Sequence, residues 1–192
     1  MSEAIKTLCA MVRHRSEENT RVMQLMATQY DIPVSPAFAL LRQELDSMVK
    51  AIFLLSKDKS EREKYATELL SGQRWKIKNR TGKDRNVLDK DLVALAQELQ
   101  DWTRSVYKFG CAFIHLSEFH NYFASNPFSR LSREELNDIA NHLAQYHGYD
   151  PTKELTIESV RMYIPMIFKK ITSNLECYIA DLEAGREIDD NN

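Results

Sequence analysis

The chain has 192 residues, of which 43% are hydrophobic and 28% are charged. A chain of this length buries enough apolar surface to fold as one domain without a disulfide or a structural metal, and its composition is not that of a disordered protein. The net charge is −2, so an attraction to nucleic acid or to a membrane surface has to arise from a local cluster of charges.

The three cysteines, Cys9, Cys111 and Cys177, lie far apart and form no CxxC pair. This spacing excludes a zinc ribbon and a thioredoxin-type redox motif, and it predicts reduced thiols. The first residues lack the basic-then-apolar pattern of a signal peptide, and no apolar run approaches the roughly 18 residues that a membrane span needs. We therefore expect a cytoplasmic protein without a membrane segment.

The hydrophobic periodicity predicts an all-α fold, a single-domain bundle of about five to six helices over residues 1–185. Residues 31–184 are expected to form the core, with an N-terminal helix within 1–30 packed on it, and 186–192 to form an acidic flexible tail. Glycine and proline are scarce, with five of each, and no Asn-Gly or Asp-Gly signal predicts a β-hairpin.

The predicted helices, in chain order, cover about 2–29, 36–56, 61–71, 89–123, 133–147 and 157–184. A break near Ser16 is an alternative for the first helix, and Pro165 should kink or restart the last one. A basic connection over 73–87 separates the third helix from the fourth.

Local signals mark several helix ends. Ser35 before Pro36 is typical of an N-cap followed by the first helical residue. Glycines that follow periodic stretches predict C-caps at Gly72, Gly148 and Gly185. Three pairs have the spacing of a capping box: Ser60 with Glu63, Ser132 with Glu135, and Thr156 with Ser159.

The predicted helix 89–123 has two distinct faces and is expected to organise the bundle. At 100° per residue, one face is an apolar seam of Trp102, Val106, Phe109, Phe113, Leu116, His120 and Phe123. The opposite face is a polar stripe of Arg104, Lys108, Cys111, His115, Glu118 and Tyr122. Gly110 costs about 1 kcal/mol relative to alanine inside a helix, which indicates the close approach of another helix.

The polar stripe has two interpretations. It is either a solvated face with helix-spaced ion pairs, or a phosphate-handling surface on which His115 moves a proton to or from a ribose hydroxyl. The flanking Tyr107 and Ile114 favour a partly covered face, with a second copy of the chain as one candidate cover. His120 lies on the apolar seam and is expected to be a buried or boundary histidine held by one hydrogen bond.

The stretch from Val106 to Ser117, VYKFGCAFIHLS, resembles the central helix of HEPN-type helical bundles, several of which place His-x-Ser after an apolar pair. The C-terminal helix with Asn174 to Tyr178 fits such a bundle, and the resemblance covers about 36–184. It implies a homodimer linked to RNA, defence or toxin–antitoxin biology. In catalytic members it implies a metal-independent ribonuclease whose site combines an arginine and a histidine across the dimer.

This chain differs from the catalytic HEPN pattern at the position of the positively charged residue that precedes the histidine. Six residues separate Lys108 from His115 where the family has an arginine, and Arg104 is too distant, with ten residues between. A lysine binds phosphate as a point charge and lacks the bidentate guanidinium. The departure favours a non-catalytic or weakly active protein, with His115, Lys108 and Arg104 as the candidate catalytic residues.

The connection is the second candidate site. Its basic residues, interleaved with one aromatic, are candidates for nucleic-acid binding through phosphates and base stacking: Arg74, Trp75, Lys76, Lys78, Arg80, Lys83 and Arg85. The alternatives are a solvated loop that Trp75 and Ile77 fasten to the bundle, and a contact surface for an acidic protein partner or for the chain's own acidic tail.

Other kinds of site have little support in the sequence. A Glu-x-x-His pair at Glu118 fails, no Gly-rich phosphate loop exists, and no metal or cofactor is expected. His142, Tyr146, His147 and Tyr149 are candidates for a pocket rim, although a helix C-terminus that favours histidine explains them as well. An enzyme with a small-molecule pocket between helices is the third hypothesis.

Overall fold

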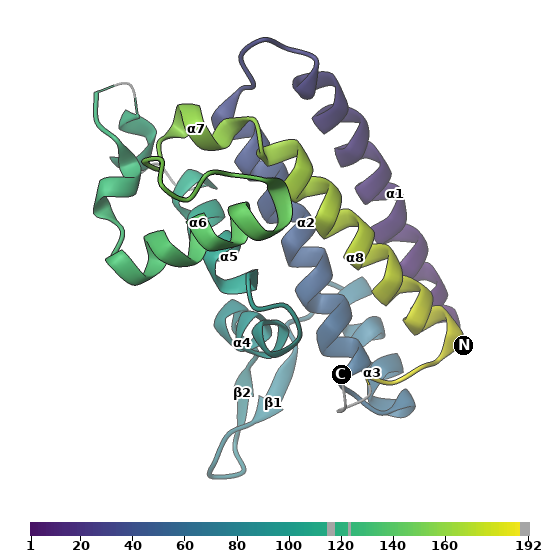
Figure 1. Ribbon diagram of the computed structural model, residues 1–192. Coiled ribbons are helices and arrows are strands. Elements are labelled where there is room, and N and C mark those ends of the chain that lie inside the picture. The colour runs from purple at the N-terminus through teal and green to yellow at the C-terminus, as the bar shows by residue number, and fades with distance from the viewer. Residues whose placement is uncertain (115–117, 123, 189–192) are drawn as a thin grey trace.

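The computed structural model describes residues 1–114, 118–122 and 124–188. Helices dominate this part of the chain, and the single sheet is a hairpin of two three-residue strands (Figure 1). The all-α prediction is therefore confirmed. Within the described ranges, no helix is both long enough and apolar enough to cross a bilayer.

The first half of the chain holds α1 (Glu3–Ala27), α2 (Val34–Leu55), α3 (Lys59–Leu70), β1 (Lys76–Lys78), β2 (Asp84–Asn86) and α4 (Asp89–Leu99). The second half holds α5 (Thr103–Ile114), the 3₁₀ turns η1 (Glu118–Asn121) and η2 (Pro127–Arg130), α6 (Arg133–His147), α7 (Ile157–Arg161) and α8 (Ile164–Ala184). The first helix is continuous through Ser16, and Pro165 restarts the chain as α8 in its first turn, as one alternative predicted.

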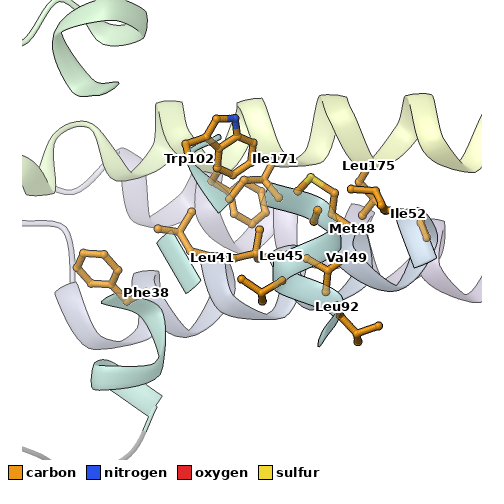
Figure 2. Close-up of a cluster of buried hydrophobic side chains, with 14 of the residues drawn as sticks. Phe38, Leu41, Leu45, Met48, Val49, Ile52, Leu92, Trp102, Ile171 and Leu175 are labelled. Atoms are coloured by element: carbon orange, nitrogen blue, oxygen red, sulfur yellow. The ribbon is translucent and has the colours of Figure 1, made fainter. Parts of the chain in front are cut away.

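The centre of the bundle is α2, not the predicted helix 89–123. Fifteen of its 22 residues are buried, and it packs against α1, α3, α4, α5 and α8. A helix whose buried residues extend around most of its circumference has to be enclosed by other elements. Figure 2 shows its side chains meeting α8, α4 and Trp102 in a cluster that includes Leu41, Leu45, Met48, Val49, Ile52, Leu92, Ile171 and Leu175.

The predicted helix 89–123 was wrong in its continuity, because the chain leaves helical geometry at Gln100 and resumes at Thr103. No glycine or proline marks the break. It is stabilised by side chains instead: the Gln97 amide donates to the Asp101 carbonyl and accepts from the Arg104 N–H, while the Thr103 hydroxyl donates to the Gln100 carbonyl. Such side-chain partners replace the backbone bonds that the break removes.

The apolar seam is confirmed where it is described. Trp102, Phe109 and Phe113 are buried, Val106 and His120 are partly buried, and Leu116 and Phe123 lie outside the described residues. Gly110 also behaves as predicted. A Cβ there would lie 3.3 Å from the Cβ and Cδ of Arg42 on α2, so the missing side chain lets α5 approach α2 closely.

The helix-end predictions are confirmed in part. Two capping boxes form both of their bonds: Ser132 with Glu135, and Thr156 with Ser159. Gly72, Gly148 and Gly185 have positive φ after helix ends.

The predicted N-terminal ends of two helices, α2 and α3, were wrong. The N-cap of α3 is Asp58, which accepts from the N–H groups of Ser60 and Glu61, and α2 begins at Val34 after Pro33. In the predicted 186–192 tail, of which residues 186–188 are described, the Arg186 carbonyl accepts a hydrogen bond from Arg62 at 2.5 Å.

One carboxyl is fully buried between α1 and α2. Glu44 is 0% exposed, and its Oε1 accepts from Asn19 Nδ2 at 3.3 Å. Burial raises the pKa of Glu44, and the contacts with Ser16 and Asn19 oppose this shift without cancelling it. The charged form therefore destabilises the native state at neutral pH.

A Glu44→Gln substitution should make this destabilisation measurable as a change in the pH dependence of the free energy of unfolding. The raised pKa means that the carboxyl's favourable contribution is complete below its unfolded pKa and is lost as pH rises through its folded pKa. The free energy of unfolding of Glu44→Gln relative to the natural chain should increase between pH 4 and 8, by on the order of 1 kcal/mol. Denaturant titrations across this range measure it. A constant difference would contradict the assigned cause, and the exposed Glu17→Gln is the matched control.

Candidate functional site

The basic connection folds as an antiparallel β-hairpin, although no Asn-Gly or Asp-Gly pair marks its turn. Lys76 pairs with Asn86, Ile77 with Arg85, and Lys78 with Asp84. The turn is organised by Asn79, whose Oδ1 accepts from the N–H groups of Thr81 and Lys83. Gly82, at φ +78°, supplies the left-handed residue that the turn requires. The hairpin projects from the lower end of the bundle in Figure 1.

One face of the hairpin is fixed to the bundle. The Trp75 ring stacks on Phe53 at a centroid distance of 4.9 Å, and its Nε1 donates to the Tyr65 carbonyl at 2.7 Å. The Tyr65 hydroxyl in turn donates to the Lys76 carbonyl. Arg85 forms a bidentate pair with Asp91 at 2.6 and 3.0 Å, which ties β2 to the first turn of α4. These contacts hold the hairpin on α2, α3 and α4.

Lys76 and Lys78 point to the opposite side of β1 from Ile77, because successive strand residues point to opposite sides. The side chains of Arg74, Lys76, Lys78, Arg80 and Lys83 are exposed. Lys78 forms an ion pair with Asp84 at 2.6 Å and holds the pKa of that carboxyl below its usual range. The remaining four form no ion pair with any residue that the structure describes. The hairpin segment therefore carries four exposed cations without an ion pair, of which Lys76 also acts electrostatically on Asp84.

Two of the predicted nucleic-acid-binding residues have other roles. Trp75 is 6% exposed, so it does not present a ring face on which a base could stack. This agrees with the alternative that Trp75 fastens the segment to the bundle. The Arg85 charge is matched by Asp91. The candidate surface is therefore reduced to Arg74, Lys76, Arg80 and Lys83, with Lys78 paired beside them.

The polar stripe of α5 is partly occupied by internal contacts. Lys108 Nζ forms an ion pair with Oε1 of Glu135, whose other oxygen caps α6. Arg104 is exposed in the first turn of α5. His115 lies outside the described residues, so the proposed combination of His115 with Lys108 or Arg104 stays a prediction. The same holds for the HEPN-like assignment and the ribonuclease activity that it implies.

The cover over this stripe comes from the same chain. Arg42 Nε donates to Cys111 Sγ at 3.4 Å, and the Arg42 guanidinium lies 3.9 Å from the Tyr107 ring centroid. The Tyr107 hydroxyl donates to Asp89 at 2.7 Å, and burial raises its pKa. Residues of α2 and α4 thus contact Tyr107 and Cys111 within the same chain. A homodimer stays a prediction.

The histidines of α6 are kept neutral rather than charged. Burial, with a contribution from Lys170, lowers the pKa of His142 to about 4, and the pKa of His147 is lowered for the same reasons. A helix C-terminus alone would favour the charged form, so the explanation by the helix dipole does not account for these residues. Lys170 Nζ lies 3.2 Å from the Tyr146 ring centroid, beside the two imidazoles.

No group of three histidine, cysteine or carboxylate side chains in the described part of the chain has the arrangement of a metal site. Cys9 is buried, and burial raises the pKa of its thiol to about 11, which makes it unreactive.

Comparison with protein-family models, with curated proteins and with solved structures finds no match for this chain.

The His142 environment gives a prediction for acid stability. Its pKa falls from 6.5 to about 4 on folding, so the unfolded chain binds the proton more readily, and the free energy of unfolding should fall as pH drops from 6.5 to 4. Because the side chain is only partly buried, we expect a loss of about 1 to 2 kcal/mol. His142→Phe should remove this loss, as measured by urea unfolding at pH 7 and 4.5. The exposed His14→Phe is the control, and equal pH dependence in both variants would contradict the prediction.

Proposed function

We propose that the chain is a non-enzymatic binding module that uses the exposed cations of the β1–β2 hairpin segment to hold the phosphate backbone of a nucleic-acid duplex. The observation that supports this proposal is a set of four exposed cations without an ion pair on a hairpin that Trp75 and Arg85 fasten to the bundle: Arg74, Lys76, Arg80 and Lys83. Cations that the fold does not use are free to displace counterions from phosphates.

A duplex suits this surface better than a single strand. Single-strand binding relies on aromatic platforms for the bases, and the one aromatic residue of the segment, Trp75, faces the bundle. A projecting two-stranded ribbon has dimensions that the major groove of B-form DNA admits. Lysine and arginine without base-reading partners bind the backbone independently of sequence. We therefore infer weak, sequence-independent binding governed by salt.

The salt dependence gives the sharpest test. Four phosphate contacts predict a slope of about −3.6 for log K against log salt, or roughly a 150-fold loss of affinity between about 50 and 200 mM KCl. The double variant Lys76→Gln/Lys83→Gln should reduce this slope to about −1.8. Fluorescence anisotropy of a labelled duplex, titrated with protein at several salt concentrations, measures both values.

The control variant removes the same number of positive charges from a part of the surface outside the hairpin. Lys153→Gln/Lys169→Gln replaces two exposed lysines outside the hairpin and should leave the slope unchanged. Duplex RNA, duplex DNA and polyglutamate serve as parallel probes. The proposal fails if neither duplex binds, if the control lowers the slope as much as the hairpin variant, or if polyglutamate binds as tightly as the duplexes, which would indicate an acidic protein partner.

A further inference from the structure

A pocket of about 360 Å³ lies between α5, α6 and the start of α8, beside the break that separates α4 from α5. Its floor is apolar, with Phe38, Trp102, Phe109, Phe128 and Ile164 among the lining residues. The volume is at the lower end of the roughly 300 to 1,000 Å³ that small-molecule sites occupy. The pocket therefore suits a compact organic molecule with an apolar body.

The wall on the α6 side is polar but carries no positive charge. Asp138, Asn141, His142 and Gln145 line the pocket at positions i, i+3, i+4 and i+7, which share one face of a helix. His142 is neutral at physiological pH, because burial lowers its pKa to about 4. The described lining contains neither lysine nor arginine. The lining itself thus offers no cation to an anionic ligand, although Lys170 Nζ lies 5.3 Å from the Trp102 ring centroid.

The negative charges at the pocket are not used by the fold. Asp101 and Asp138 are exposed, and neither carboxylate forms an ion pair or hydrogen bond with a described residue. Lys170 acts on Asp101 electrostatically, but its Nζ lies over the Tyr146 ring at 3.2 Å instead of pairing with it. By contrast, Asp91 is held by an arginine. The pocket thus combines an apolar floor with two carboxylates that have no ion-pair or hydrogen-bond partner among the described residues.

We propose that this pocket binds a small organic amine, with its apolar or aromatic body on the floor and its ammonium group at the carboxylates of Asp101 and Asp138. Neither carboxylate belongs to the hairpin, so the proposal is independent of nucleic-acid binding. The neutral His142, Asn141 and Ser105 add polar atoms that orient the ligand.

The test uses Trp102, which lines the pocket, as the reporter. The chain has two tryptophans, so Trp75→Phe leaves Trp102 as the one source of indole fluorescence. Titration with 2-phenylethylamine should produce a saturable change in this signal. 3-Phenylpropionate has the same ring and the opposite charge, and it should bind at least tenfold more weakly. Ligand-observed NMR on the natural chain repeats the comparison without any substitution.

The charge variants decide the assignment. Asp101→Asn and Asp138→Asn should each weaken 2-phenylethylamine about fivefold, the scale of an exposed ion pair, and leave the uncharged 2-phenylethanol unaffected. Glu98→Gln, an exposed acid on α4 outside the lining, is the control and should change neither ligand. The proposal is overturned if the amine does not saturate, if the carboxylate binds as well as the amine, or if the control variant weakens the amine as much as the two pocket variants.

Discussion

The enclosure of α2 is the constraint on which the rest of the structure depends. The enclosed side of α2 cannot solvate a charge, yet it carries Arg42, which is only 4% exposed. Asp46 on the same helix and Asp89 at the start of α4 pair with its guanidinium, and Cys111 accepts from it on α5. A buried guanidinium costs several kcal/mol unless it is paired and hydrogen-bonded. The partners that offset this cost also fix α4 and α5 on α2.

The sequence was sufficient for those parts of the fold that follow from periodicity and capping. The 133–147 helix was predicted with its observed bounds, because its capping box and its C-terminal glycine are local signals. The break at Gln100 was not predictable in this way, since Gln97 and Thr103 stabilise it through side-chain bonds that no composition rule marks. The central position of α2 in the bundle could not be predicted from the sequence either. Periodicity shows which residues are apolar, but not which helix the others surround.

The sequence shows which residues of the candidate site are basic, but it did not lead to the prediction that they form a hairpin. Basic residues alternate with Trp75 and Ile77 along β1, a period of two that is typical of a strand, and this was the available signal for the hairpin. It was missed because the turn is built by Asn79 and Gly82 with two residues between them, not by an Asn-Gly pair. The pocket gave no sequence signal, because its floor comes from α2, α5, η2 and α8, and only tertiary packing brings these together.

The net charge of −2 conceals two surfaces of opposite sign. Many charged side chains form ion pairs within the fold. Arg13 of α1, for example, pairs with Glu176 and Glu183 of α8. Unpaired charges remain at several places on the described surface, among them the cations of the hairpin and the carboxylates at the pocket. At physiological salt the screening length is about 8 Å, so surfaces on different elements act on ligands separately rather than cancelling each other. A total charge near zero therefore excludes neither a polyanion nor a cation as a ligand, and the charges that the fold leaves unpaired are the better guide to what each surface binds.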